Sequence, residues 1–490
     1  MAALLVNHGN PLLGVSQLLT WIQENMGGDF NGALILTSVF LGMMIAFVYK
    51  GGGYSAISEY ITKRIHSRKA IQIIVAFFGL LICWDDYTNT MVVGTSMRPI
   101  TDKYDISRAK LAYIIDSTAA PIASIFTVSL WVGFQVSIIA EKLKDLGITE
   151  NAYSVWLSSL PYILYSFGAI LMVLFIVFSS RDFGPMYTEE IRAMKSGKPV
   201  RDDAELLMNP ESDLGKEGKP TSIWVFFLSL VTLIGVAFFG MWLTGGGPGG
   251  IGILEAIKNS DVMKALLWGA VASDIALAFY LLAAKVFSLK ETVNIAISGA
   301  KLMVYPVMFT VMAWTIGSAC SAVDTSGYVV STVKNLVTPN IIPIILLLLA
   351  SFTAWSTGSS WGTFAIMIPI SIGLVYALTG TIDTIMFASL GAVFSGSIFG
   401  DHCSPISDTT VMSSIFSSAN HIDHVTTQMP YALTALVATA ISFIIFAIIP
   451  SISGTVLLLI NLVILLIMAY SLSMKFGGST KELKKSVVEG

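Results

Sequence analysis

The sequence has little charge and little cysteine. Only 12% of its 490 residues are Asp, Glu, Lys or Arg, about half of the share that a soluble domain carries. So few charged side chains cannot cover a water-soluble body, and 54% of the residues are hydrophobic. The composition therefore predicts a protein that crosses a membrane several times. It excludes a disordered, collagen-like or disulfide-scaffold chain.

The cysteines and the charge balance exclude further classes. Cys83, Cys320 and Cys403 lie in or beside apolar runs, which is typical of small buried side chains rather than bridges. The net charge of −3 comes from 28 basic and 31 acidic residues, so nothing indicates binding of nucleic acid. The N-terminus lacks a basic stretch followed by an apolar core and a cleavage site, so we expect no cleavable signal.

Many apolar stretches approach the length of about 20 residues that a membrane-spanning helix needs. They are 33–49, 111–140, 155–178, 223–243, 262–287, 293–320, 341–355, 363–378, 431–449 and 455–472. Two further stretches, 71–97 and 385–414, are apolar at the edges and polar in the middle. We expect an all-α polytopic membrane protein with about 10–12 transmembrane segments.

Positive charge predicts which loops face the cytoplasm. The loops 50–70 and 98–110 are both rich in Lys and Arg, so both should be cytoplasmic. The stretch 71–97 between them then cannot cross the membrane once, and we expect it to enter and return as a re-entrant hairpin. Its tip falls near residues 84–89, Trp-Asp-Asp-Tyr-Thr-Asn.

The chain divides into two membrane halves. We expect an N-terminal segment at 1–30, a first half at 31–180, a polar cytoplasmic linker at 181–221, a second half at 222–473 and a tail at 474–490. Each half has a polar-centred stretch followed by a helix that contains proline, Pro121 or Pro430. Transporters often contain such repeats in inverted orientation. We therefore expect inverted halves and a second hairpin at about 385–414, although the sidedness of the tail stays open.

The strongest functional signal is the segment 400–410, Gly-Asp-His-Cys-Ser-Pro-Ile-Ser-Asp-Thr-Thr, between two apolar runs. Carboxylates, hydroxyls and an imidazole are costly at membrane depth and usually serve a function there. Pro405 also interrupts backbone hydrogen bonding and leaves carbonyls free. Carboxylate, hydroxyl and carbonyl oxygens suit a hard cation such as Na⁺. A polar surface loop is the plainer interpretation.

Weaker polar sets lie elsewhere. They are Asp85 to Thr90, Asp116 to Pro121, and a hydroxyl-rich break at 355–363, where glycine permits an unwound turn. Asp116 is equally compatible with a helix start at the interface, and Asp274 is a lone carboxylate within 262–287. Residues 358–362 match the G-x-S-x-G motif of hydrolases, but that motif needs an α/β sheet, so we expect no enzyme.

The segments 400–414, 355–363 and 116–121 resemble the NhaC-type Na⁺/H⁺ antiporter family, with 400–414 as the most specific part. The resemblance covers about 33–449 and implies a homodimer with two re-entrant hairpins and elevator-like motion. It implies ion-handling roles for Asp401, Ser404, Ser407, Asp408, Thr409, Ser359 and Thr363, and more loosely for Asp85, Asp86, Asn89 and Asp116. Relatives in this family include carriers of organic solutes such as malate, lactate and amino acids.

These observations predict a secondary active transporter of the cytoplasmic membrane that exchanges Na⁺ for H⁺ without a cofactor. A buried carboxylate favours its neutral form, and a bound cation restores the charge. Asp408 is the expected main Na⁺ ligand and Asp401 its partner, while His402 either tunes the pH response or only holds a hydrogen bond. The main alternative is a Na⁺- or H⁺-coupled carrier of a small organic solute, which tryptophans beside the breaks would suit. A channel and an intramembrane hydrolase are weaker alternatives.

Overall fold

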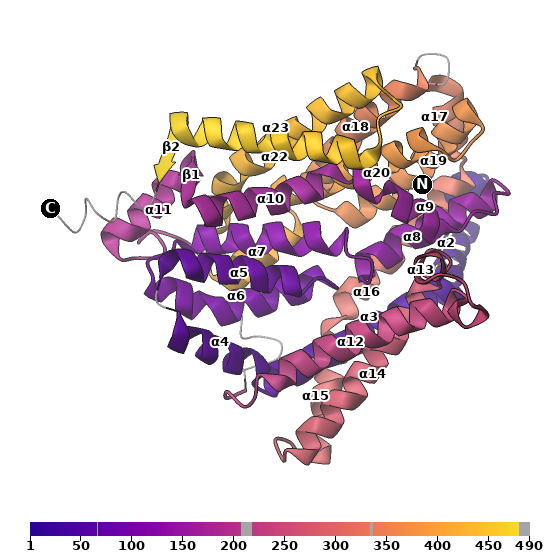
Figure 1. Cartoon of the computed structure of the whole chain (residues 1–490). Coiled ribbons are helices and arrows are strands. Elements are labelled where there is room, and N and C mark those ends of the chain that lie inside the picture. Colours follow the sequence, from indigo (N-terminus) through magenta and orange to yellow (C-terminus); the bar gives the residue numbers. More distant parts are fainter. Residues whose placement is uncertain (66, 207–217, 334–336, 480–490) are drawn as a thin grey trace.

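The computed structural model describes residues 1–65, 67–206, 218–333 and 337–479, and these ranges are almost entirely helical (Figure 1). The first half contains α1 (Ala2–Val6), α2 (Pro11–Gly27), α3 (Asp29–Lys50), α4 (Gly53–Arg64), α5 (Arg68–Leu81), α6 (Asp86–Lys103), α7 (Arg108–Ala123), α8 (Leu130–Asp145), α9 (Ala152–Ser159) and α10 (Leu164–Ser179). Residues 207–217 of the expected linker and 480–490 of the expected tail lie outside the described residues.

The elements of the rest of the chain begin with a short strand. They are β1 (Arg181–Phe183), α11 (Pro185–Ser196), α12 (Trp224–Thr244), α13 (Ile253–Lys258), α14 (Val262–Ala283), α15 (Leu289–Leu302), α16 (Val304–Ala322), α17 (Thr325–Val333), α18 (Ile342–Thr357), α19 (Ser360–Thr379), α20 (Thr384–Cys403), α21 (Asp408–Ser417), α22 (His421–Ile448), α23 (Gly454–Phe476) and β2 (Gly477–Ser479). Short 3₁₀ turns occupy Leu160–Tyr162, Gly247–Gly249 and Pro339–Ile341.

Within the described ranges, nine helices are long and apolar enough to cross a membrane, and a bent pair over 152–179 raises the number to ten. This confirms the expected all-α polytopic class. The expected single span at 111–140 is wrong, because α7 ends at Ala123 and α8 starts only at Leu130. Ser129 caps α8 by accepting a hydrogen bond from the backbone N–H of Val132, which fixes the new start.

The expected tip of the first hairpin lies at a real break between two helices. α5 ends at Leu81, and Asp85 caps α6 by accepting from the N–H of Thr88. The start of α5 lies near the end of α6, since Arg68 donates to the carbonyl oxygen of Asp105. α5 and α6 are therefore antiparallel neighbours, as Figure 1 shows. That α5 and α6 enter and leave the membrane at the same face, as a re-entrant hairpin does, stays a prediction.

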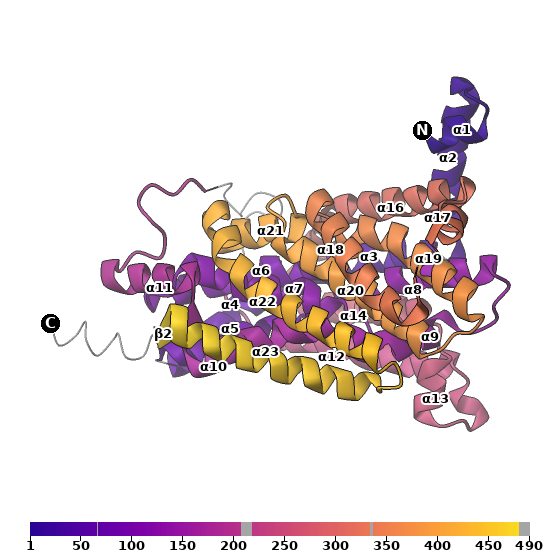
Figure 2. The same cartoon turned by 90° about the horizontal axis from the view of Figure 1, so that it is seen from above.

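The expected hairpin at 385–414 is not what the structure shows. α20 runs parallel to α18, because Gly396 packs on Leu347 and Gly400 on Trp355. Beyond the break at 404–407, α21 continues in the same direction as α20. Figure 2 shows α20 and α21 as successive parts of one path. The stretch is a broken helix rather than a hairpin.

The antiparallel pair of the second half is instead α18 and α19. Its break falls at Gly358, whose φ of +67° suits glycine. A Cβ there would also lie 2.8 Å from the carbonyl oxygen of Ile406. The hydroxyl-rich break at 355–363 is therefore the tip of a helical pair, and α20–α21 is the broken helix that follows it.

The end of the described chain lies beside the linker. β1 pairs with β2 in antiparallel register, with Arg181 opposite Ser479, and Figure 1 shows both strands next to α11. The end of α10 is also close to the start of α5, because Lys69 donates to the carbonyl oxygen of Phe178. We call this side, where α5 begins and α6 ends, the basic side. The described end of the chain thus belongs to the basic side.

Buried ion pairs hold the basic side together. Lys110 on α7 lies 2.5 Å from a carboxylate oxygen of Asp182, and the side chains are 1% and 0% exposed. Arg68 pairs with the fully buried Glu190 of α11. Burial by itself raises the pKa of Glu190, but the charges of Arg68 and Lys110 hold this pKa below its ordinary value. These pairs fix α5, α7 and the start of the linker to one another.

Candidate functional site

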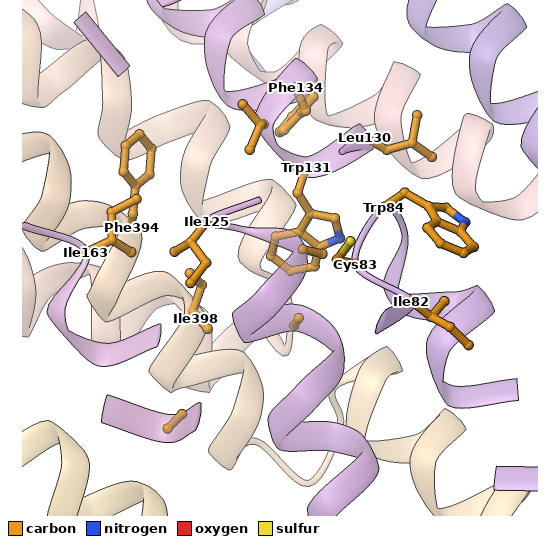
Figure 3. Packing of buried hydrophobic residues seen from close by; sticks show 14 of the residues in the cluster. Ile82, Cys83, Trp84, Ile125, Leu130, Trp131, Phe134, Ile163, Phe394 and Ile398 are labelled. Carbon is orange, nitrogen blue, oxygen red and sulfur yellow. The ribbon is translucent and has the colours of Figure 1, made fainter. Parts of the chain in front are cut away.

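Breaks from both halves of the chain meet at one place. The N–H of Leu130, at the start of α8, donates to the carbonyl oxygen of Trp84 at the tip of α5–α6, at 3.0 Å. The hydroxyl of Ser360, at the tip of α18–α19, donates to Asp401 at 2.9 Å. Figure 3 shows the apolar side chains around the first of these tips, among them Trp84 and Trp131. Tyr87, at the start of α6, donates to Asp408, at the start of α21, at 2.7 Å, so the breaks of the two halves surround a common centre. In transporters such places are where sites form.

Asp401, in the last turn of α20, has both carboxylate oxygens engaged. Ser407 donates to Oδ1 at 2.5 Å and Ser360 to Oδ2 at 2.9 Å. Ser407 also contacts the hydroxyl of Thr409 at 2.9 Å and caps α21. The carboxylate is 1% exposed. Asp401 is therefore held between the second pair of helices and the broken helix by hydroxyl donors alone.

Asp408 begins α21 and is only partly buried. The phenol of Tyr87, at the start of α6, donates to Oδ2 at 2.7 Å, and the N–H of Thr409 donates to Oδ1 at 3.0 Å. This contact links the two halves of the chain directly. A narrow crevice, with a cavity volume of about 0 Å³, lies next to it and is lined by Asp86, Tyr87, Thr90, Thr409 and Met412.

The first tip adds two buried carboxylates and an amide. Asp85 accepts from the N–H and the hydroxyl of Thr88, at 2.8 and 2.6 Å. Asp86 accepts from the indole N–H of Trp131 at 3.0 Å, and its other oxygen is buried without a hydrogen-bond partner. The amide nitrogen of Asn89 lies 2.6–2.9 Å from three carbonyl oxygens and shares its two hydrogens among them, so it stabilises the turn. Of this set, Asp86 faces the crevice and Asp85 serves as a cap.

Asp116 lies in the middle of α7 and is fully buried. Gln428 of α22 donates to its Oδ2 at 2.6 Å, and Thr410 contacts the same oxygen at 3.3 Å. The other oxygen, Oδ1, is buried without a hydrogen-bond partner. Thr410 also contacts the carbonyl oxygen of Asp401 at 3.4 Å. The interfacial interpretation of Asp116 is therefore wrong, and this residue borders the centre.

The imidazole of His402 is fixed by two hydroxyl groups. Its Nε2 lies 2.9 Å from Ser117 and its Nδ1 lies 2.7 Å from the phenol of Tyr165. The ring is 2% exposed and 4.0 Å from Asp116. A role of His402 in the pH response stays a prediction.

Three of the expected residues use their hydroxyls locally. Ser359 caps α19 by accepting from the N–H of Gly362, and Thr363 donates to the carbonyl oxygen of Ser359. Ser404 accepts from the N–H of Ile406 at 3.4 Å. Their expected ion-handling roles stay predictions, and their neighbour Ser360 is the hydroxyl that contacts Asp401.

Other side chains at the centre were not predicted. They are Ser360, Tyr87, Thr410, Trp131 and Gln428. Ser360, Tyr87 and Thr410 lie inside the polar segments that the sequence singled out, so the sequence indicated the region in which they lie. Trp131 and Gln428 lie inside apolar helices, and only the packing brings them to the carboxylates.

The centre is rich in negative side chains that have no fixed cation. Across the described ranges, no Lys or Arg forms an ion pair with Asp85, Asp86, Asp116, Asp401 or Asp408. The same ranges hold no group of three or more His, Cys, Asp or Glu side chains suited to a metal ion. Hydroxyls, carbonyls and single carboxylates are thus the available oxygen ligands, a donor set that fits a hard monovalent cation.

Many apolar helices, with carboxylates and helix breaks buried among them, define a polytopic membrane protein of the transporter class. The chain belongs to the Na⁺/H⁺ antiporter family, whose family model matches residues 122–448. An uncharacterized protein of Haemophilus influenzae is 32% identical over 85% of this chain and 78% of its own length. The expected family is therefore confirmed.

Three further similarities are more limited. The Malate-2H(+)/Na(+)-lactate antiporter of Bacillus subtilis is 36% identical over 21% of this chain and 22% of its own length. The YdaH transporter of Alcanivorax borkumensis shares the fold at 14% identity, with a TM-score of 0.58 over 90% of each chain. MtrF of Neisseria gonorrhoeae, also 14% identical, has a TM-score of 0.54 over 95% of this chain and 86% of that one. The protein is thus a secondary transporter rather than an enzyme.

Proposed function

We propose that this protein exchanges Na⁺ for H⁺. The observation that carries the proposal is a set of five aspartates, four at helix breaks and Asp116 within α7, that form no ion pair with Lys or Arg in the described part of the chain. An ionised carboxylate without a partner is costly in a buried site, so each of these groups favours a proton or a bound cation. Competition of the two ions for the same negative charge then produces exchange.

Asp401 and Asp408 form the proposed Na⁺ site. Ser407 and Thr409 place hydroxyl oxygens beside Asp401, and the break at 404–407 interrupts the helical hydrogen bonds there. Asp408 is the partly exposed member and borders the crevice. That crevice has a cavity volume of about 0 Å³, against roughly 300–1,000 Å³ for typical small-molecule pockets. Its size therefore argues against an organic solute at this place.

A Na⁺- or H⁺-coupled carrier of a small organic acid is the second candidate. A second pocket, with a cavity volume of about 50 Å³, lies between α8, α16, α17 and α19. Its lining contains Lys142 together with the acidic residues Glu141, Asp145 and Asp324. A lysine ammonium group is a suitable contact for a carboxylate. The printed name of the Bacillus subtilis relative, a malate and lactate antiporter, points the same way.

The two candidates differ in what drives proton movement. Na⁺ added to everted, acid-loaded vesicles that contain the protein should release protons from the lumen with no organic solute present. Vesicles without the protein are the control. Proton release that appears only after malate, lactate or an amino acid is supplied would favour the second candidate and overturn the first.

Further parts of the proposal concern the assembly and the membrane. We propose a homodimer in the cytoplasmic membrane, with the basic side facing the cytoplasm. In this arrangement α5–α6 is re-entrant from the cytoplasm and α18–α19 from the outside. Helices α3, α12, α14 and α15 pack together apart from the centre (Figure 1), which supports a body against which the site moves.

A further inference from the structure

A row of hydrogen-bonded side chains connects the start of α22 to Asp116. His421, which is partly exposed, lies with its Nδ1 3.0 Å from the hydroxyl of Ser414. The same hydroxyl lies 2.9 Å from Nδ1 of His424. On its other side, His424 Nε2 is 3.8 Å from Oδ2 of Asp116. Neighbouring groups in the row are thus within hydrogen-bond distance of each other, except for His424 and Asp116.

The partners of the two rings determine where their hydrogens lie. His421 Nε2 contacts the carbonyl oxygen of Pro405 at 2.6 Å, so this nitrogen carries a hydrogen. His424 Nε2 contacts Oε1 of Gln428 at 2.9 Å, and the Gln428 NH₂ group is committed to Asp116, so this nitrogen carries a hydrogen too. In neutral rings, both Nδ1 atoms are therefore hydrogen-bond acceptors.

Both acceptors point at a hydroxyl that has only one hydrogen. Ser414 can donate to one Nδ1 or to the carbonyl oxygen of Thr410, which lies 2.9 Å away. One ring nitrogen is always left without a donor, and His424 and Ser414 are 0% and 1% exposed. One added proton on His421 Nδ1 satisfies both nitrogens: this N–H donates to Ser414, which donates to His424. The row is arranged to accept one proton.

The outer end of the row lies on the basic side. Asn420, just before His421, donates to the carbonyl oxygen of Glu205 in the linker. Other charged or titratable groups nearby are already bonded: Asp423 pairs with Arg201, and His402 contacts Ser117 and Tyr165. Within the described residues, these contacts leave His421 as the outer end of the row that leads to Asp116.

We propose that His421, Ser414 and His424 form a relay that carries protons between the basic side and Asp116. An incoming proton binds Nδ1 of His421 and passes from there to the Ser414 oxygen, while the Ser414 hydroxyl gives its own hydrogen to Nδ1 of His424. His424 then releases the hydrogen on its Nε2 to Oδ2 of Asp116. Rotation of the Gln428 amide opens the last step. His421, Ser414 and His424 end neutral, and Asp116 ends protonated. His424 ends as the tautomer with its hydrogen on Nδ1, and rotation of the ring resets it for the next proton.

This inference rests on the proposed Na⁺/H⁺ exchange and separates the two ions within it. Na⁺ occupies Asp401 and Asp408, whereas Asp116 holds the proton. Thr410 lies between these parts, since its hydroxyl reaches both Asp116 and the carbonyl oxygen of Asp401. Na⁺ binding at Asp401 and proton release from Asp116 are thereby coupled.

The test measures proton release from the purified full-length protein in weakly buffered detergent solution after rapid addition of NaCl. A pH dye reports the rate and the amplitude. In His424→Gln and Ser414→Ala, the amplitude should remain and the rate should fall at least about tenfold, because a positioned proton carrier contributes on the order of 10²–10⁴-fold. His421→Gln, altered at the exposed end, should also be slow.

Ser417→Ala is the matched control, because Ser417 is a buried serine of the same helix that bonds only to Ser413 and Ser414 carbonyl oxygens. Its release rate should equal that of the original protein. Relay variants that fold and release protons at the original rate would overturn the proposal, and so would variants that lose ²²Na⁺ binding together with proton release. An original protein that binds Na⁺ but releases no protons would instead refute the exchange function itself.

Discussion

Neutralising Asp408 should abolish Na⁺-driven proton release without unfolding the protein. Asparagine keeps the shape of the side chain and one carbonyl oxygen, which can still accept from Tyr87 or from the N–H of Thr409. It can neither carry negative charge nor release a proton. Because a carboxylate in the membrane usually costs stability, its removal should not lower the melting temperature.

The size of the effect follows from the position of Asp408. This residue is partly exposed, so an effective dielectric constant of about 20 applies, and a unit charge about 4 Å from Na⁺ contributes about 4 kcal/mol. At about 1.4 kcal/mol for each factor of ten, the loss weakens Na⁺ binding about a thousandfold. The Na⁺ concentration that gives half-maximal proton release should rise beyond the range that the assay can use.

The assay is Na⁺-dependent proton release from everted, acid-loaded vesicles, with purified yield and melting temperature recorded for each variant. Asp274→Asn is the matched control, because Asp274 is a 7% exposed aspartate of α14 whose carboxylate oxygens have no hydrogen-bond partner. This control should exchange like the original protein. Exchange by Asp408→Asn at the original Na⁺ dependence would refute the proposed site and direct attention to Asp86 and Asp116.

Other predictions concern the basic side and the orientation of the chain. Lys110→Met should cost about 3 kcal/mol of the free energy of unfolding, because it leaves buried carboxylates without this cation; an unchanged melting temperature would contradict it. The depressed pKa of Glu190 means that its stabilisation is complete above the ordinary glutamate pKa and is lost as the pH falls below it. Thermal melting of Glu190→Gln should therefore show a flatter acid limb. Single cysteines at positions 103 and 475 should react with a membrane-impermeant reagent from one face, and a cysteine at position 381 from the other face. Labelling of positions 103 and 475 from opposite faces would contradict the proposal that both lie on the basic side.

The polar segment at 400–410 could be located from the sequence because carboxylates and proline inside apolar runs are rare. Asp401 and Asp408 indeed lie at a helix break. The choice between Ser359 and Ser360 could not be made, since one residue changes the direction of a side chain by about 100° around a helix. Ser359 turns to its own backbone, and Ser360 faces Asp401.

The second hairpin was misplaced because a re-entrant pair and a broken helix give the same pattern of apolar edges and a polar centre. Loop charge gave no help, since neither 379–383 nor 418–420 contains Lys or Arg. The deciding feature is the parallel packing of α20 on α18 through Gly396 and Gly400. Contacts between helices of this kind leave no signal in a single sequence.

The glycine contacts between α18 and α20 have a mechanical consequence. A Cβ on Gly400 would lie 2.5 Å from the backbone nitrogen of Trp355, so no side chain stands between the two backbones to absorb a displacement. Ser360 and Asp401, which follow directly on these segments, are joined by a hydrogen bond. The two helices must therefore behave as one stiff lever whose end carries the carboxylate. Any tilt of α18 then moves Asp401, the proposed ion ligand, by a similar distance, and under that proposal ion occupancy and large-scale movement are linked.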